Sequence, residues 1–140
     1  MGMRQKNLTI TKLKKIRASR KTLVRKLDQL VSLIVRTRDK ACINKGCTAR
    51  DNFTCGHLFS RVAYSTRWDL GNCYKQCLAH NLRHEYDPYA MTQAVTLLKG
   101  KEYVDELYQR WHTPVILKDF MLEEMVKQYE VILKDLQHKV

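Results

Sequence analysis

The sequence predicts an α+β fold that is mostly α-helical, with a small zinc-stapled ββα core flanked by an N-terminal basic helix and C-terminal helices. Two short-range pairs of metal ligands, Cys42/Cys47 and Cys77/His80, bracket a stretch without helical periodicity. Apolar residues recur at helical spacing on both sides of that stretch. The chain has 140 residues, of which 44% are hydrophobic, so it suits one small domain with helical extensions.

Basic residues are concentrated at the N-terminus. Residues 1–40 contain thirteen Lys or Arg and two Asp, a charge of +11, whereas the whole chain carries +12. A concentrated basic element binds polyanions and releases their counterions, which favours a nucleic-acid partner. Residues 1–18 have little apolar content and are expected to form a basic arm. The alternative is a solvated, disordered tail, which would still bind phosphate.

A basic helix is expected over residues 19–40, with Ser19 as its N-cap. Its apolar side recurs at spacings of three and four residues and consists of Leu23, Leu27, Leu30, Val31 and Ile34. Lys21, Arg25 and Lys26 lie on the opposite side and are expected to contact DNA. The alternative for each of them is that it simply solvates the outer face.

Residues 41–88 are expected to form the zinc-stapled core. Turn-forming residues divide this stretch, and the two arms of a β-hairpin are expected over residues 53–59 and 72–76. A helix over residues 76–83 would place His80 and Asn81 on its first turns.

Residues 89–140 are expected to form a C-terminal helical region. The first helix covers residues 89–99 and ends at Gly100, and the second covers residues 101–111. Thr113 followed by Pro114 predicts the start of a third helix, which runs to about His138. Its inward side is expected to contain Leu117, Met121, Met125, Ile132 and Leu136.

Charge and cysteine content indicate the compartment. The N-terminal segment is charged where a signal peptide needs an apolar core, and no apolar run approaches the length of about 18 residues that crosses a membrane. We therefore expect a cytoplasmic protein without a membrane partner. Five cysteines in a reducing compartment favour metal ligands over disulfides. Cys55 and Cys73, outside the two pairs, are expected to be small buried hydrophobes.

The bracketing pairs supply four ligands for a tetrahedral structural Zn²⁺, namely Cys42, Cys47, Cys77 and His80. Inside the bracket stand the residue types that a one-metal phosphodiesterase requires. His57 has the pKa range of a general base for water. Asn81 offers a neutral oxygen to a catalytic Mg²⁺ or Mn²⁺. Asn72 is placed to hydrogen-bond across the hairpin and to orient the His57 loop.

Three runs of residues carry a family resemblance: Cys55-Gly-His-Leu-Phe-Ser-Arg61, Ser65-Thr-Arg-Trp-Asp69 and Asn72-x3-Gln76-Cys77-x2-His80-Asn81. In order and spacing they resemble the NinG/Rap phage recombination nucleases of the HNH, or ββα-metal, superfamily. The resemblance extends from about residue 21 to about residue 136. It implies a phage or bacterial endonuclease in the host cytoplasm, dependent on a divalent metal and acting on branched DNA such as Holliday junctions, D-loops and flaps. It also implies that His57 is the general base, Asn72 the loop-orienting residue and Asn81 the catalytic-metal ligand.

The chain departs from this pattern at three positions. Relatives usually carry Cys where this chain has His80, so the zinc would be held by three cysteines and one histidine. Relatives often carry Asp where this chain has Thr54, and many HNH enzymes place an acidic metal ligand where it has Gly56. Asn81 and waters would then hold the catalytic metal. The candidates for a second ligand are Asp51, Asp69, His84, Glu85 and Asp87.

Two arginines in the core suit phosphate binding, because a guanidinium group binds phosphate in a bidentate manner. Arg61 is favoured over Arg67, since it lies closer in sequence to His57. Trp68 is expected to pack the small core, although a tryptophan can also stack on an unpaired base.

Two further functions fit the same residues. A non-catalytic zinc-containing DNA-binding module of recombination would use the basic residues but would not need the His57/Asn81 pair. A nuclease acting on RNA would share the chemistry. Symmetric cutting of a four-way junction needs two active sites, which favours a homodimer, with the last helix as one candidate interface. The alternative is that this helix only closes the monomer core.

Overall fold

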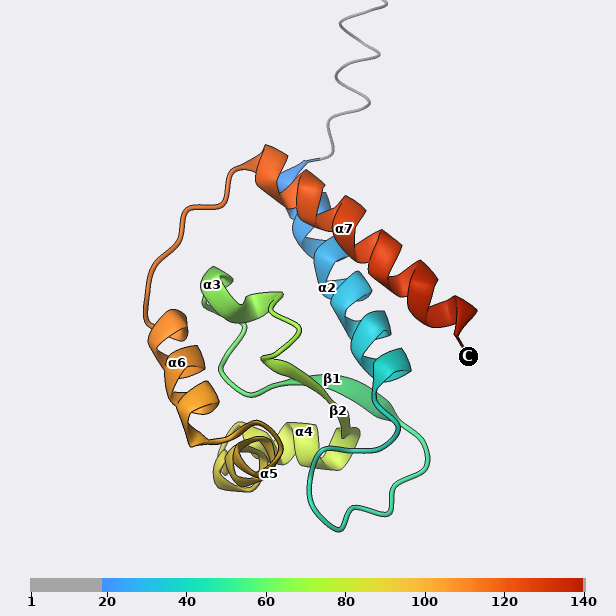
Figure 1. The fold of residues 1–140 in the computed structure, drawn as a ribbon, viewed down its shortest axis with the longest axis vertical. Coiled ribbons are helices and arrows are strands. Elements are labelled where there is room, and N and C mark those ends of the chain that lie inside the picture. Colours follow the sequence, from blue (N-terminus) through green and yellow to red (C-terminus); the bar gives the residue numbers. More distant parts are fainter. Residues whose placement is uncertain (1–18, 140) are drawn as a thin grey trace, which may run out of the picture.

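The computed structural model describes residues 19–139, which form six helices and a two-stranded sheet (Figure 1). The expected basic arm, residues 1–18, lies outside the described residues. In chain order the elements are α2 (Arg20–Arg38), β1 (Phe53–His57), α3 (Tyr64–Arg67), β2 (Cys73–Cys77), α4 (Leu78–His84), α5 (Tyr89–Lys99), α6 (Lys101–Trp111) and α7 (Asp119–His138). The predicted α+β class with mostly helix is confirmed. In this part of the chain no helix has the length and apolarity needed to cross a membrane.

Helix α2 begins where the sequence predicts. The Ser19 hydroxyl oxygen accepts a hydrogen bond from the backbone N–H of Thr22 at 3.2 Å, which satisfies one of the free donors of the first turn. All five residues predicted for the apolar side are buried, together with Val35. The amphipathic pattern of the sequence therefore determines which side of α2 faces the core.

The C-terminal end of α2 is tied to strand β2 by Arg38 and Asp39. The two side chains form an ion pair of 2.7 Å, and the Arg38 guanidinium also donates to the backbone carbonyls of Leu70 and Cys73, each at 2.8 Å. Asp39 in turn accepts the backbone N–H of Lys75 at 2.9 Å. These contacts fix the end of α2, and so the start of the loop that carries Cys42 and Cys47.

Strands β1 and β2 form the predicted hairpin, and they pair antiparallel with Phe53 opposite Cys77 and His57 opposite Cys73. Because side chains alternate along a strand, the hairpin presents two different faces. One face carries Cys55 and Cys73 and packs against the α2 cluster, whereas Tyr74 on the other face belongs to the cluster of α5 and α6. The loop between the strands contains α3, a one-turn helix that the sequence did not predict.

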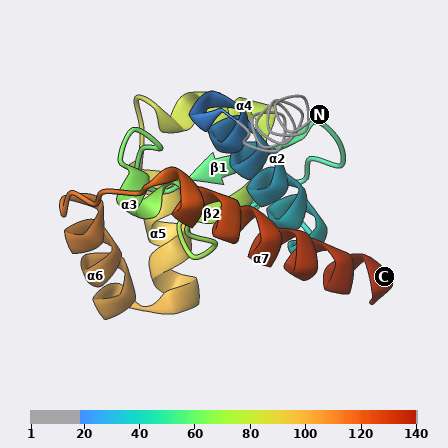
Figure 2. The same cartoon turned by 90° about the horizontal axis from the view of Figure 1, so that it is seen from above.

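Two apolar clusters lie on either side of this hairpin. Helices α2 and α7 run side by side in the same direction and form the first, which includes Trp68 (Figures 1 and 2). Trp68 is 1% exposed, so its predicted role in the core is confirmed. The second cluster consists of Leu58, Tyr74, Met91, Val95, Val104 and Leu107. The hairpin is thus held from both faces.

The prediction that the last helix starts at Thr113-Pro114 is wrong, because α7 begins at Asp119. The Thr113 hydroxyl donates to the carbonyl of Gln109 at 2.7 Å, so Thr113 closes α6 instead of opening α7. Leu117 packs against the first apolar cluster while the chain is still extended. At the helix start, Asp119 pairs with Arg20 at 3.0 Å.

The inward side of α7 also differs from the prediction. Leu122 and Val126 are buried, and Met125, Tyr129 and Leu133 pack beside them. Met121 was predicted to face inward but is exposed, and the neighbouring Leu122 takes its place. This side of α7 packs against α2, so it closes the core of the single chain.

Candidate active site and metal centre

The four predicted zinc ligands come together at one end of the hairpin. Cys42 and Cys47 lie in the loop after α2, where Gly46 has a φ of +77°, a backbone conformation that suits glycine. Cys77 ends β2 and is the N-cap of α4, and His80 stands in the first turn of that helix. The Cys77 sulfur accepts the backbone N–H of His80 at 3.4 Å.

The separations between these ligand atoms suit zinc. The four atoms all lie within 4.8 Å of one another, with Cys42 Sγ 3.6 Å and Cys77 Sγ 3.1 Å from His80 Nδ1, and Cys47 Sγ 3.9 Å from Cys77 Sγ. A tetrahedral Zn²⁺ with ordinary bond lengths keeps such atoms roughly 3.5–3.8 Å apart. The group can therefore hold a metal ion such as zinc, bound by three cysteines and one histidine.

His57, at the end of β1, is oriented by a backbone carbonyl. Its Nε2 lies 2.9 Å from the oxygen of Arg67, so Nε2 carries the proton that is donated and Nδ1 keeps its lone pair. Burial, which disfavours the charged imidazolium, lowers the pKa of His57 below its ordinary value despite this hydrogen bond. A neutral imidazole with one free lone pair is the form that a general base requires.

A cavity of about 260 Å³ borders His57 and lies between β1 and α2. Arg36, Arg61 and Arg67 line it, together with the carboxylate of Asp28. Three guanidinium groups against one carboxylate give this cavity a positive surface, which suits a phosphate group. Arg36 is not among the residues that the sequence indicated for phosphate binding. The signal that would have found it is its spacing of four residues from Ser32 and eight from Asp28, which puts all three on one side of α2.

The Arg67 guanidinium is already engaged within the chain. It makes two hydrogen bonds to Asp28, of 2.9 and 2.6 Å, and the Trp68 indole N–H donates to the same carboxylate at 2.8 Å. Arg61, by contrast, is exposed beside the cavity. Of the two arginines predicted to bind phosphate, Arg61 is therefore the freer one.

Asn81, on α4, lies on the other side of the hairpin strand. Its amide Nδ2 donates to the Thr54 hydroxyl at 2.9 Å, which leaves the Asn81 side-chain oxygen without a hydrogen bond among residues 19–139. Thr54 also borders the His57 cavity, so it lies between the two predicted catalytic residues. No hydrogen bond joins His57 and Asn81 directly in this part of the chain.

Comparison with known proteins decides the family. The family model described as Bacteriophage Lambda NinG protein matches residues 3–139 of this chain. The chain belongs to the NinG family. No curated protein and no solved structure matches the chain.

In this NinG-family chain, Asn72 is fully buried and holds the segment that follows His57. Its side-chain oxygen accepts the backbone N–H of Phe59, and its Nδ2 donates to the carbonyls of Phe59 and Thr66. These three bonds, of 2.9, 2.9 and 3.1 Å, cross the loop of the hairpin. Asn72 is thus built to position the loop, and it does not face the cavity.

Packing explains why position 56 is a glycine, which the sequence alone did not reveal. A Cβ at this position would lie 2.2 Å from the side-chain oxygen of Gln76, so a larger residue would have to displace that buried side chain. The same Gln76 donates through Nε2 to Asn44 at 2.7 Å. The acidic residue that many HNH enzymes carry here would therefore require a different arrangement of Gln76.

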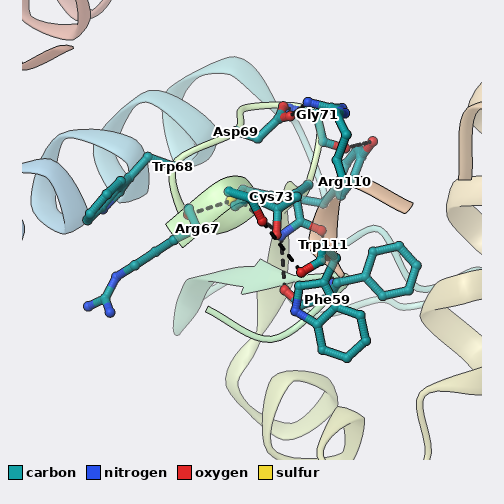
Figure 3. Close-up of polar contacts among 12 residues, drawn as sticks. Phe59, Arg67, Trp68, Asp69, Gly71, Cys73, Arg110 and Trp111 are labelled. Carbon is teal, nitrogen blue, oxygen red and sulfur yellow. Dashed lines mark hydrogen bonds and ion pairs between the residues drawn. The ribbon is translucent and has the colours of Figure 1, made fainter. Parts of the chain in front are cut away.

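Several candidates for a second metal ligand have structural partners instead. Asp69 accepts the backbone N–H of Gly71 at 2.8 Å and pairs with Arg110 at 2.5 Å (Figure 3). His84 Nε2 donates to the carbonyl of Leu58 at 3.0 Å. Asp51, Glu85 and Asp87 are exposed and lie outside the cavity.

The basic residues predicted on α2 are exposed. Lys26 lies 3.4 Å from Glu130 of α7, whereas Lys21 and Arg25 form no ion pair among residues 19–139. Lys21 and Arg25 are thus available to a polyanion, and Lys26 is partly neutralised.

The Asp28 contacts give a stability prediction that depends on pH. Burial alone would raise the pKa of Asp28, but hydrogen bonds from Arg67 and Trp68 outweigh it, and the pKa is lower than its ordinary value. A carboxyl group with a lowered folded-state pKa stabilises the fold above its unfolded pKa, about 4, and loses this contribution as pH falls through the folded pKa.

Replacing Asp28 by Asn should therefore lower the free energy of unfolding at pH 7 by about 1–3 kcal/mol. Urea unfolding at pH 7 and at pH 3 measures the effect, and the gap between Asp28→Asn and the wild type should narrow at pH 3. A gap that stays the same at both pH values would contradict the assigned role of the carboxylate.

Proposed function

We propose that this chain is a structure-selective endonuclease that hydrolyses phosphodiesters in branched DNA with the help of a divalent metal. The observation that carries the proposal is the orientation of His57, whose Nε2 is bound to the Arg67 carbonyl beside a cavity bordered by three arginines. A histidine held in one tautomer next to a positive cavity suits water activation beside a phosphate. Membership of the NinG family and the resemblance to recombination nucleases support the same reading.

In this mechanism His57 accepts the proton of the attacking water at Nδ1. Arg61 binds a non-bridging oxygen of the scissile phosphate, since its guanidinium is exposed at the cavity. Asn72 keeps the loop after His57 in place through its three hydrogen bonds. The carbonyl of Arg67 stabilises the imidazolium that forms when His57 takes up the proton.

Asn81 would hold the catalytic metal through its side-chain oxygen. A bound Mg²⁺ or Mn²⁺ supplies charge stabilisation to the phosphate and the leaving 3′ oxygen. Among residues 19–139, β1 pairs with β2 alone, so the other edge of β1 carries no strand from this part of the chain. We infer that the phosphate binds along that edge, with His57 on one face of the hairpin and Asn81, bonded to Thr54, on the other.

Exposed basic groups supply the DNA affinity in this proposal. Lys21 and Arg25 are exposed on α2, and Arg36 and Arg61 border the cavity. The charge of +11 in the first 40 residues adds a non-specific, salt-dependent contribution. Cutting both strands of a four-way junction would require two copies of the active site, which favours a homodimer on DNA.

The second candidate function is a non-catalytic zinc-containing DNA-binding module. It is favoured by the absence of a carboxylate at positions 54 and 56, which leaves Asn81 as the metal ligand next to β1. Such a module would use the zinc cluster and the basic groups, and it would have no need of an oriented His57.

A panel of end-labelled DNA molecules with identical arm sequences tests the proposal. The four-way junction, flap and D-loop should be cut in Mg²⁺ or Mn²⁺, and the linear duplex should be cut far more slowly. Equal cutting of all four molecules would contradict structure selectivity. Salt-dependent binding with no cutting of any substrate would support the DNA-binding module instead.

The Asn81 side chain gives a sharper test of the metal site. Asn81→Ala should lower the cleavage rate at saturating DNA by at least about 10²-fold, because the metal supplies several kcal/mol of transition-state stabilisation. Asn81→Asp keeps an oxygen ligand and should retain more activity than Asn81→Ala. A Mg²⁺ titration of the single-turnover rate measures both variants, and an unchanged Mg²⁺ dependence in Asn81→Ala would exclude Asn81 as the ligand.

A further inference from the structure

A second group of soft metal ligands lies on the α2 face of the hairpin. Cys55, His57 and Cys73 each offer one ligand atom, and these atoms all lie within 4.8 Å of one another. The register explains the grouping, since His57 stands directly opposite Cys73 and Cys55 is two residues before His57 on the same face. These residues are separate from the four that form the zinc cluster.

The surroundings of this group suit a three-ligand site with an open position. Cys55 and His57 line the cavity of about 260 Å³, so a cation can reach them and a water can complete its coordination. Cys73 is fully buried behind them, where its thiol lies 3.8 Å from the carbonyl oxygen of Arg67 (Figure 3). Asp28, which lines the same cavity, is already bound through its carboxylate to Arg67 and Trp68.

We propose that Cys55, His57 and Cys73 form a second metal site, which binds Zn²⁺ or another thiophilic divalent cation with its fourth position left to water. Two thiolates and one imidazole are a ligand set that zinc accepts in sites with an open position. On binding, the two thiols become thiolates and release their protons to the buffer, while the imidazole contributes one of its ring nitrogens. Mg²⁺ prefers oxygen ligands and would not compete for this site.

The site has a regulatory consequence, which rests on the proposed nuclease function. A cation bound to the His57 ring fixes the imidazole as a metal ligand and places a positive charge beside it, so His57 could no longer take up the proton of water and the metal-loaded chain would be inhibited. Excess Zn²⁺ would then block cleavage even though Zn²⁺ in the four-residue cluster supports the fold. Binding at the second site does not itself depend on nuclease activity.

Zinc stoichiometry of the full chain tests the site. The reduced protein is equilibrated with Zn²⁺ at buffered free concentrations, and bound zinc per chain is measured by atomic emission. The two ligand groups predict two zinc ions in the wild type. Cys55→Ala should bind one, and so should Cys55→Ser, which protects the test if one variant fails to fold. His84→Gln, a histidine outside both groups, should still bind two.

A single zinc in the wild type at every concentration would overturn the proposal, as would two zinc ions in both Cys55 variants. Cobalt substitution gives a second readout, because the thiolate-to-Co²⁺ absorption of the wild type should exceed that of Cys55→Ala. In a cleavage assay, excess Zn²⁺ should slow the wild type at least about tenfold and Cys55→Ala far less, each relative to its own rate without added zinc. A wild-type chain that binds two zinc ions at high free Zn²⁺, but cuts no DNA in Mg²⁺ or Mn²⁺ even when it holds only the zinc ion of the four-residue cluster, would refute the proposed nuclease and leave the metal site intact.

Discussion

Replacing Cys77 by serine should release the zinc ion of the four-residue cluster and unfold the core around the hairpin. Cys77 has three structural roles. It ends β2, it is the N-cap of α4, and it belongs to the four-residue metal cluster, where its Sγ lies 3.9 Å from Cys47 Sγ and 3.1 Å from His80 Nδ1. Structural zinc contributes apparent binding free energies of about 10–16 kcal/mol in small zinc domains, which is comparable to the whole stability of a domain. Residues 41–52 have little regular structure to hold them without that metal.

The same site supplies a matched control. His80→Cys should keep the zinc and the fold, because four thiolates are also a good zinc site, whereas His80→Ala should lose both. Zinc content by atomic emission and thermal unfolding by circular dichroism measure the three variants. Cys77→Ser with the wild-type zinc content and unfolding temperature would show that the cluster does not staple the fold.

Replacing His57 by alanine should lower the rate of DNA cleavage by about 10²–10⁴-fold, which is the usual contribution of a general base. DNA affinity should stay within about threefold of the wild type, because the phosphate contacts come from arginine and lysine side chains. Single-turnover cleavage and gel-shift binding with the same labelled junction measure the two quantities.

His84 provides the control for this experiment. Like His57, it is half-buried and hydrogen-bonded through Nε2 to a backbone carbonyl, in this case that of Leu58. It lies outside the cavity, so His84→Gln should cut at close to the wild-type rate. An equal loss of cleavage in both variants would point to a general effect on folding instead of a role for His57.

Much of the fold could be predicted because local signals agreed with the tertiary structure. Helices α5 and α6 have the predicted bounds, since Gly100, with a φ of +94°, ends one and precedes the other. The four residues predicted to bind zinc converge as their spacing indicates, so that they could hold a metal ion. In these segments the pattern along the chain and the packing of the fold specify the same structure.

The parts that could not be predicted depend on contacts between distant residues. Thr113-Pro114 has the sequence of a helix start. However, Thr113 is hydrogen-bonded to Gln109 of α6 and Leu117 packs against the first apolar cluster, so α7 begins only at Asp119. The hydrogen bonds that Arg38 and Asp39 form with Leu70 and Lys75 join residues more than thirty positions apart in the sequence. No local pattern reveals such partners.

The candidate site was predictable in its residue types and less so in its arrangement. The sequence indicated His57, Asn72 and Asn81, but not that strand alternation puts His57 on the α2 face and Thr54, the partner of Asn81, on the other. From the sequence, Cys55 and Cys73 are expected to be two separate, small buried hydrophobic residues. Only the register of the hairpin places both beside His57.

One measurement tests most directly our proposal that this chain hydrolyses DNA with a divalent metal. Purified wild-type protein with its zinc content verified is incubated with a labelled four-way junction, either in Mg²⁺ or in a buffer that contains a Mg²⁺ chelator. Nicked products are expected in Mg²⁺ and none with the chelator, while the junction binds equally well in both buffers. Tight binding of the junction without any product in Mg²⁺ or Mn²⁺ would contradict it.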